Sequence, residues 1–189
     1  MDLKSKTGAN LLKTFAGESR AHLKYKLYAE IAMREGYIWI AEIFKETAYN
    51  ELAHAREVYE RFLGLASDTK GNLMDAIKGE TEERKNIYRQ YEEDARNEGF
   101  DEIADFYKEI RDVEENHEER FTDIYERVES GYLFESSENR MWKCMNCGYI
   151  FEGTEAPMIC PLCKYPQRYF KPYCYPLNDN DGISSLLKE

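Results

Sequence analysis

The chain has 189 residues, the size of one or two domains. Its 26 Lys and Arg residues against 37 Asp and Glu residues give a net charge of −11, which argues against binding to nucleic acid, because such binding needs clustered positive charge. A composition of 42% hydrophobic and 33% charged residues is typical of a soluble globular protein. The sequence has no apolar run long enough to predict a membrane span. The first twenty residues lack the apolar core of a signal peptide, so we expect a cytoplasmic protein.

The cysteines and prolines are unevenly distributed: all five of each follow position 143. The first 143 residues are rich in Glu, Lys, Arg, Ala and Leu, which predicts a helical region. The remainder has the composition of a small module held together by a metal or by disulfides. We therefore predict three segments, which are a helical domain over 1–136, a cysteine domain over 137–171 and a C-terminal extension over 172–189.

Glycines divide the helical region, as expected of residues that end helices. They predict four helices of similar length, over 9–35, 37–63, 72–98 and 101–130. Each would be roughly 40 Å long at 1.5 Å per residue. Four such helices with mostly short connections predict a mainly α fold, an antiparallel four-helix bundle.

The apolar stripe of each predicted helix contains a glutamate near its middle. In the second helix, Phe44 and Val58 share a face with Glu51 at the helical period of 100° per residue. An isolated carboxylate in a protein core costs several kcal/mol or more. These glutamates therefore predict a bound cation. They are Glu18, Glu51, Glu80 and Glu114.

Two of the helices carry a Glu-x-x-His motif, one at Glu51 and His54 and the other at Glu114 and His117. The i, i+3 spacing places the carboxylate and the imidazole on one helical face, close enough to share a metal. One further Glu from each remaining helix completes the ligand set of di-iron carboxylate bundles. Glu83 is a seventh candidate. The oxygen-rich set favours iron or manganese, and zinc stays open.

The two halves of the helical region also match. The interval from Glu18 to Glu51 is 33 residues, and the interval from Glu80 to Glu114 is 34. Glu51 and Glu114 are the expected bridging ligands, because the two oxygens of a carboxylate can each bind one metal. A single Glu-x-x-His is usually part of a solvated helix face, but two copies on matching stripes favour a metal site. His22 has no such partner, so we expect it to have an ordinary polar role.

The cysteines form two Cys-x-x-Cys pairs separated by twelve residues, a pattern that converges on one tetrahedral metal. The pairs are Cys144 with Cys147 and Cys160 with Cys163. A disulfide framework fits less well, because the cysteine count is odd. Zinc would make the module structural and iron would make it a one-electron carrier; the spacing leaves both open. Cys174 lies outside the pattern and is expected to be a free thiol.

Together these motifs resemble the rubrerythrin family over residues 8–171. The resemblance rests on Ala16-Gly-Glu18-Ser19, the two Glu-x-x-His motifs, Gly79-Glu80-x-x-Glu83 and the two cysteine pairs, in that order. It implies a ferritin-like di-iron bundle followed by a rubredoxin-like iron domain. The implied di-iron ligands are Glu18, Glu51, His54, Glu80, Glu83, Glu114 and His117, and the implied rubredoxin ligands are Cys144, Cys147, Cys160 and Cys163.

The resemblance further implies reduction of hydrogen peroxide, with electrons from NAD(P)H. A separate reductase or rubredoxin would deliver them, since no Gly-x-Gly-x-x-Gly fingerprint is present. Glu83, Tyr25 and Tyr88 would act at the site, in a homodimer that is head-to-tail or helix-swapped. Two alternatives stay open: a ferritin-like iron-oxidising or iron-handling protein, and a redox-inactive structural protein that binds zinc.

Overall fold

The computed structural model describes residues 2–173. Cys174 and the remainder of the predicted extension, 174–189, lie outside the described residues. The chain divides into two compact units, Met1–Asn72 and Leu73–Glu189, and each is considered by itself.

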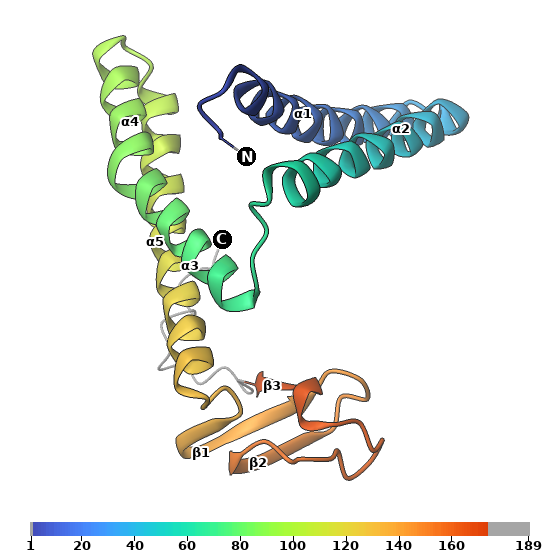
Figure 1. Cartoon of the computed structure of the whole chain (residues 1–189), viewed down its shortest axis with the longest axis vertical. Helices are drawn as coiled ribbons and strands as arrows, with labels where there is room; N and C mark the ends of the chain where they lie inside the picture. Colours follow the sequence, from blue (N-terminus) through green and yellow to red (C-terminus); the bar gives the residue numbers. More distant parts are fainter. Residues whose placement is uncertain (1, 174–189) are drawn as a thin grey trace. The chain divides into compact units, whose positions relative to one another are not determined.

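The first unit is a helical hairpin (Figure 1). Helix α1 spans Lys6–Arg34 and begins where the side chain of Ser5 accepts a hydrogen bond of 3.0 Å from the Gly8 amide. Helix α2 spans Ile38–Arg56 and continues through the π-helical segment η1, Glu57–Leu63. The turn between α1 and α2 requires a glycine, because Gly36 has a φ of +83°.

A second hairpin repeats this plan in the other unit. Its first arm consists of α3 (Thr69–Glu82), the π-helical segment η2 (Glu83–Ile87) and α4 (Tyr88–Asn97). Its second arm is α5, Asp101–Ser130. The turn again has a glycine at φ +83°, Gly99, and the following amide, of Phe100, donates to the Ala95 carbonyl at 2.8 Å.

The two hairpins are in register except at one point. Gly36, Ala41 and His54 recur 63 positions later as Gly99, Ala104 and His117, whereas Glu18 recurs only 62 positions later as Glu80. The second hairpin therefore has one additional residue between its first glutamate and its turn. The i→i+5 turn of η2 accommodates that residue, which keeps the flanking helical faces aligned.

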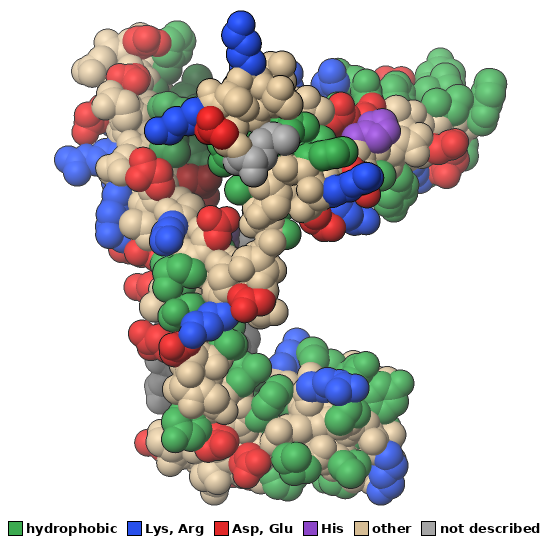
Figure 2. Space-filling model, in the orientation of Figure 1, with side chains coloured by type: hydrophobic (Ala, Val, Ile, Leu, Met, Phe, Trp, Pro, Cys, Tyr) green, Lys and Arg blue, Asp and Glu red, His purple; other side chains and the backbone are tan. Residues whose placement is uncertain are grey.

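Small residues line the contact between the arms of the first hairpin. Alanines of both helices are buried there, and Ala41 is inaccessible. By the helical period, Ile40 and Phe62 share the face of Glu51, which predicts burial. Both are exposed in this unit, because a layer of two helices can cover only one side of each helix. Figure 2 shows the hydrophobic side chains that gather at the tip of the hairpin, where Trp39 is 78% exposed.

The cysteine domain is a three-stranded antiparallel sheet with strand order β2-β1-β3. Strand β1 spans Glu135–Cys144, β2 spans Ile150–Glu155, and the short helix η3 (Gln167–Tyr169) leads into β3, Phe170–Tyr173. Its core contains Trp142, which is inaccessible and donates from Nε1 to the Gly153 carbonyl at 3.0 Å. Two of the cysteines, Cys144 and Cys160, belong to the same core.

The fold class predicted from the sequence is confirmed: the chain is mainly α, with four long helical arms followed by a small sheet domain that gathers four cysteines. Within residues 2–173, no helix is both long enough and apolar enough to cross a membrane.

Candidate metal centres

The first hairpin gathers Glu18 from α1 with Glu51 and His54 from α2. One ligand atom of each lies within 4.8 Å of the others. His54 Nδ1 lies 3.1 Å from a Glu51 oxygen and 3.5 Å from a Glu18 oxygen. The i, i+3 spacing along α2 supplies two of the three groups, and the packing of α1 supplies the third.

The second hairpin repeats the group with Glu80 from α3 and with Glu114 and His117 from α5. His117 Nδ1 lies 2.8 Å from a Glu114 oxygen and 3.5 Å from a Glu80 oxygen. The imidazole here is 35% exposed, against 62% for His54. The second group is therefore the more enclosed of the two.

In each group the first glutamate has a raised pKa. A hydrogen bond to Glu51, together with burial, raises the pKa of Glu18, and the same hydrogen bond lowers the pKa of Glu51. Burial and a hydrogen bond to Glu114 raise the pKa of Glu80. Such pairs arise where carboxylates crowd without a cation. A divalent ion in either group would favour the ionised carboxylates.

Glu83 and Tyr88 lie near the second group without being members of it, and Tyr25 is not a member of the first. Glu83 is the first residue of η2, and its carboxylate faces Tyr88. Burial, and after it the charge of Glu83, raises the pKa of the Tyr88 phenol. Tyr25 packs in the first hairpin against Phe44, with ring centroids 6.2 Å apart.

The structure also reveals polar contacts between helices that the sequence patterns did not identify. His22, expected to have an ordinary polar role, joins the two arms of the first hairpin: its Nδ1 lies 2.7 Å from the Ala48 carbonyl. Arg84 joins η2 to α5 through Glu118 and Glu115. The available signal was spacing, since His22 and Arg84 each follow a glutamate of the metal groups by four residues.

The four cysteines of the sheet domain converge as their spacing predicted. One sulfur atom of each lies within 4.8 Å of the others, with Cys144 3.7 Å from Cys163 and Cys147 3.7 Å from Cys160. Two similar turns present them: the Gly148 amide donates to the Cys144 carbonyl at 2.8 Å, and the Lys164 amide donates to the Cys160 carbonyl at 3.0 Å. None of the four forms a disulfide.

The thiols of this cluster titrate very differently. Hydrogen bonds from the Asn146 side chain and the Tyr165 backbone, against the effect of burial, lower the pKa of Cys163 to about 6. The backbone of Tyr149 favours the thiolate of Cys147, but burial and the neighbouring thiols outweigh it and raise the pKa of Cys147 to about 12. Four adjacent sulfurs cannot all ionise without a cation between them.

Both donor sets fit the metals that the sequence predicted. Four convergent sulfurs suit tetrahedral zinc or iron, and carboxylate oxygens with one imidazole in each hairpin suit iron or manganese. Di-iron site candidates and a rubredoxin-like four-cysteine cluster are thus both present.

Comparison with known proteins gives the same assignment. The family model described as Rubrerythrin matches residues 9–125, and that of the rubrerythrin rubredoxin-like domain matches residues 142–171. The chain is 42% identical to Rubrerythrin-1 of Clostridium acetobutylicum, over 88% of this chain and 94% of the relative. It is 41% identical to rubrerythrin of Porphyromonas gingivalis, over 89% and 90%, and 37% identical to rubrerythrin of Nitratidesulfovibrio vulgaris, over 88% and 94%. The chain belongs to the rubrerythrin family.

Proposed function

We propose that the protein is a peroxidase that reduces hydrogen peroxide to water, with electrons relayed from NAD(P)H through a separate reductase or rubredoxin. Membership of the rubrerythrin family supports an oxidoreductase of the peroxidase type with a role in oxidative stress. The observation that carries the proposal is the presence of two chemically different donor sets in one chain. One set has oxygen and nitrogen donors, and the other has only thiols.

We assign the ligands by donor chemistry. Each hairpin group would contribute to holding two iron ions, and the four cysteines would hold a third. Glu83 is assigned as an additional carboxylate ligand, since η2 introduces it beside the second group. The di-iron ligands are then Glu18, Glu51, His54, Glu80, Glu83, Glu114 and His117, and the thiolate ligands are Cys144, Cys147, Cys160 and Cys163.

Iron bound in the hairpin groups would supply one electron per ion, and iron bound by the four thiolates would carry one electron at a time. The reaction consumes one peroxide, two electrons and two protons and yields two water molecules. The residues of the chain hold and orient these participants. Tyr88 keeps its phenol proton at neutral pH, because burial and Glu83 both disfavour the phenolate. It is thereby a hydrogen-bond donor beside the carboxylate we assign as a ligand.

Substitution of cysteines in the thiol cluster tests the proposed electron relay. In the full chain, Cys144→Ser together with Cys163→Ser removes two of the four sulfurs and leaves the hairpins unchanged. We expect NADH-driven peroxide consumption, with a reductase supplied, to be lost. One stoichiometric oxidation of the chemically reduced protein by peroxide should survive. Unchanged NADH-driven turnover would refute the relay.

The choice of oxidant distinguishes a peroxidase from an iron-oxidising protein of the same fold. We expect Glu83→Ala to slow the reaction with peroxide more than oxygen-driven oxidation of added Fe(II). The measurement is the pair of rates on the same preparation. Equal losses would favour the iron-handling alternative, and a protein that takes up only zinc in iron-replete cells would contradict both readings. We further propose a cytoplasmic homodimer, head-to-tail or helix-swapped.

A further inference from the structure

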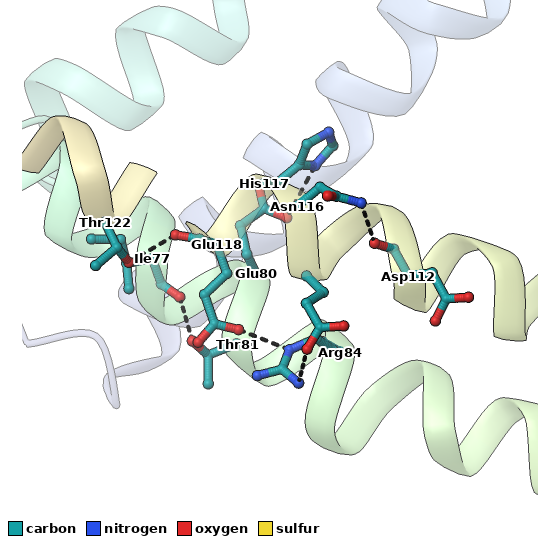
Figure 3. A network of polar contacts seen from close by, with 10 residues as sticks. Ile77, Glu80, Thr81, Arg84, Asp112, Asn116, His117, Glu118 and Thr122 are labelled. Carbon is teal, nitrogen blue, oxygen red and sulfur yellow. Dashed lines mark hydrogen bonds and ion pairs between the residues drawn. The ribbon is translucent and has the colours of Figure 1, made fainter. Parts of the chain in front are cut away.

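The second hairpin contains a charged network that joins its two arms one helical turn beyond the candidate metal ligands. Figure 3 shows Arg84, from the arm that carries Glu80, reaching across to α5. Arg84 follows Glu80 by four residues, and its partner Glu118 follows Glu114 by four. The network therefore links the same two arms as the metal group, at the next level along the hairpin.

The contacts of Arg84 have the geometry of a clamp. Its Nε donates to a Glu118 oxygen at 2.8 Å, and a terminal guanidinium nitrogen donates to a Glu115 oxygen at 3.2 Å. The Arg84 and Glu118 side chains are only 23% and 20% exposed, so solvent screens this ion pair less than an exposed one.

Threonines at both ends of the clamp donate hydrogen bonds to carbonyls of their own helices. Thr81 donates to the Ile77 carbonyl at 2.7 Å, and Thr122 donates to the Glu118 carbonyl at 2.7 Å (Figure 3). The clamp also lies beside the one-residue insertion, because Arg84 is the second residue of η2.

The first hairpin makes a different contact at the equivalent position. His22, four residues after Glu18, contacts the backbone carbonyl of Ala48 in α2. Both hairpins thus place a cross-helix contact one turn after the first glutamate. Only the second contact is an ion pair with two carboxylates.

We propose that Arg84 is a positioning residue for metal binding by the second hairpin: its ion pairs with α5 hold Glu80 opposite Glu114 and His117 before the metal enters. The inference rests on the proposed metal function of this group. Without Arg84, Glu115 and Glu118 of α5 would lose their ion pairs with the opposite arm, beside a group that already contains two other carboxyl groups. The arms would then separate or rotate, and the metal would have to draw its ligands together.

The test uses the full chain, with one equivalent of zinc first added to occupy the thiolates. Mn(II) is then titrated, because it prefers oxygen and imidazole ligands, and its binding is followed by loss of the EPR signal of free Mn(II). Arg84→Gln should weaken Mn(II) binding by about tenfold or more, the range reported for groups that orient metal ligands. An unchanged Mn(II) affinity in a variant that loses the same charge elsewhere on the arm separates positioning from an effect of net charge.

Arg89→Gln is the matched control. Arg89 lies five residues further along the same arm and pairs with Glu93 of its own helix at 3.4 Å. Its substitution therefore removes the same charge but breaks an ion pair within one helix rather than between the arms. Arg84→Lys keeps the charge but replaces the planar fork of donors with a single ammonium group, so it should give an intermediate affinity. The exchange Arg84→Glu with Glu118→Arg should recover part of the loss.

The outcomes are distinct. If the unmodified chain binds no Mn(II), the proposed metal function fails. If it binds two ions and Arg84→Gln matches Arg89→Gln, the positioning role is refuted while the metal function stands. If circular dichroism shows that Arg84→Gln does not fold, the Mn(II) affinity of Arg84→Lys is compared with that of the unmodified chain instead. Equal affinities overturn the proposal.

Discussion

The two cysteine turns place different residues in the same unusual backbone conformation. Gly148 and Lys164 each follow the second cysteine of their pair, and their φ angles are +77° and +63°. A residue with a side chain is disfavoured there by roughly 1–2 kcal/mol. A glycine loses about 0.5–1 kcal/mol more backbone entropy on folding, so the net preference for glycine is about 0.5–1 kcal/mol.

Lys164→Gly should therefore stabilise the cysteine domain, and Gly148→Ala should destabilise it by a similar amount. At Gly148 the backbone effect is isolated, because an added Cβ would meet no atom within 4 Å. Folding of such a domain is coupled to metal binding, so the change appears in zinc affinity. About 0.5–1 kcal/mol corresponds to a roughly two- to fivefold change in the zinc dissociation constant.

The assay is competition between the protein and a chromophoric chelator for zinc. Lys164→Ala is the control, because it keeps the strained backbone and removes only the exposed hydrogen bond from Lys164 Nζ to the Pro161 carbonyl. It should resemble the unmodified chain. Weaker zinc binding by Lys164→Gly, or an unchanged affinity in Gly148→Ala, would show that the backbone conformation is not what limits these turns.

Three further outcomes follow from the charges and the packing. In the metal-free protein at pH 7, iodoacetamide should modify Cys163 faster than Cys147, because their pKa values are about 6 and about 12; equal labelling of these two in peptide mass spectra would contradict this. Mn(II) should bind more tightly as the pH rises from 5 to 7, because the raised pKa of Glu18 means that a proton competes with the metal at low pH. Titrations at a series of pH values measure this dependence, and Glu18→Gln should flatten it. Ala104→Leu, at an inaccessible position, should cost about 1–3 kcal/mol in thermal unfolding, whereas Ala53→Leu, at an exposed one, should have little effect; similar losses would refute the assigned packing.

The sequence by itself determined the local parts of both candidate centres. The pairing of Glu51 with His54 follows from the helical period, and the turn that joins Cys144 to Cys147 follows from a spacing of three. Such relations depend on few dihedral angles, so they can be predicted before any packing is known. The positions of the four long helices were predictable for the same reason, since glycines end them.

Only the tertiary structure decided which side chains meet between helices. The contact of Arg84 with Glu118 depends on the register of two arms, and no local spacing specifies that register. The π-helical segment η2 shifts the register by one residue, and it brings Glu83 beside Tyr88. The left-handed conformation of Lys164 is a further result of folding, because the hydrogen bond to the Cys160 carbonyl imposes it against the preference of the residue. Periodicity therefore predicts which residues share a helical face, whereas the packing of one helix on another decides what that face contacts.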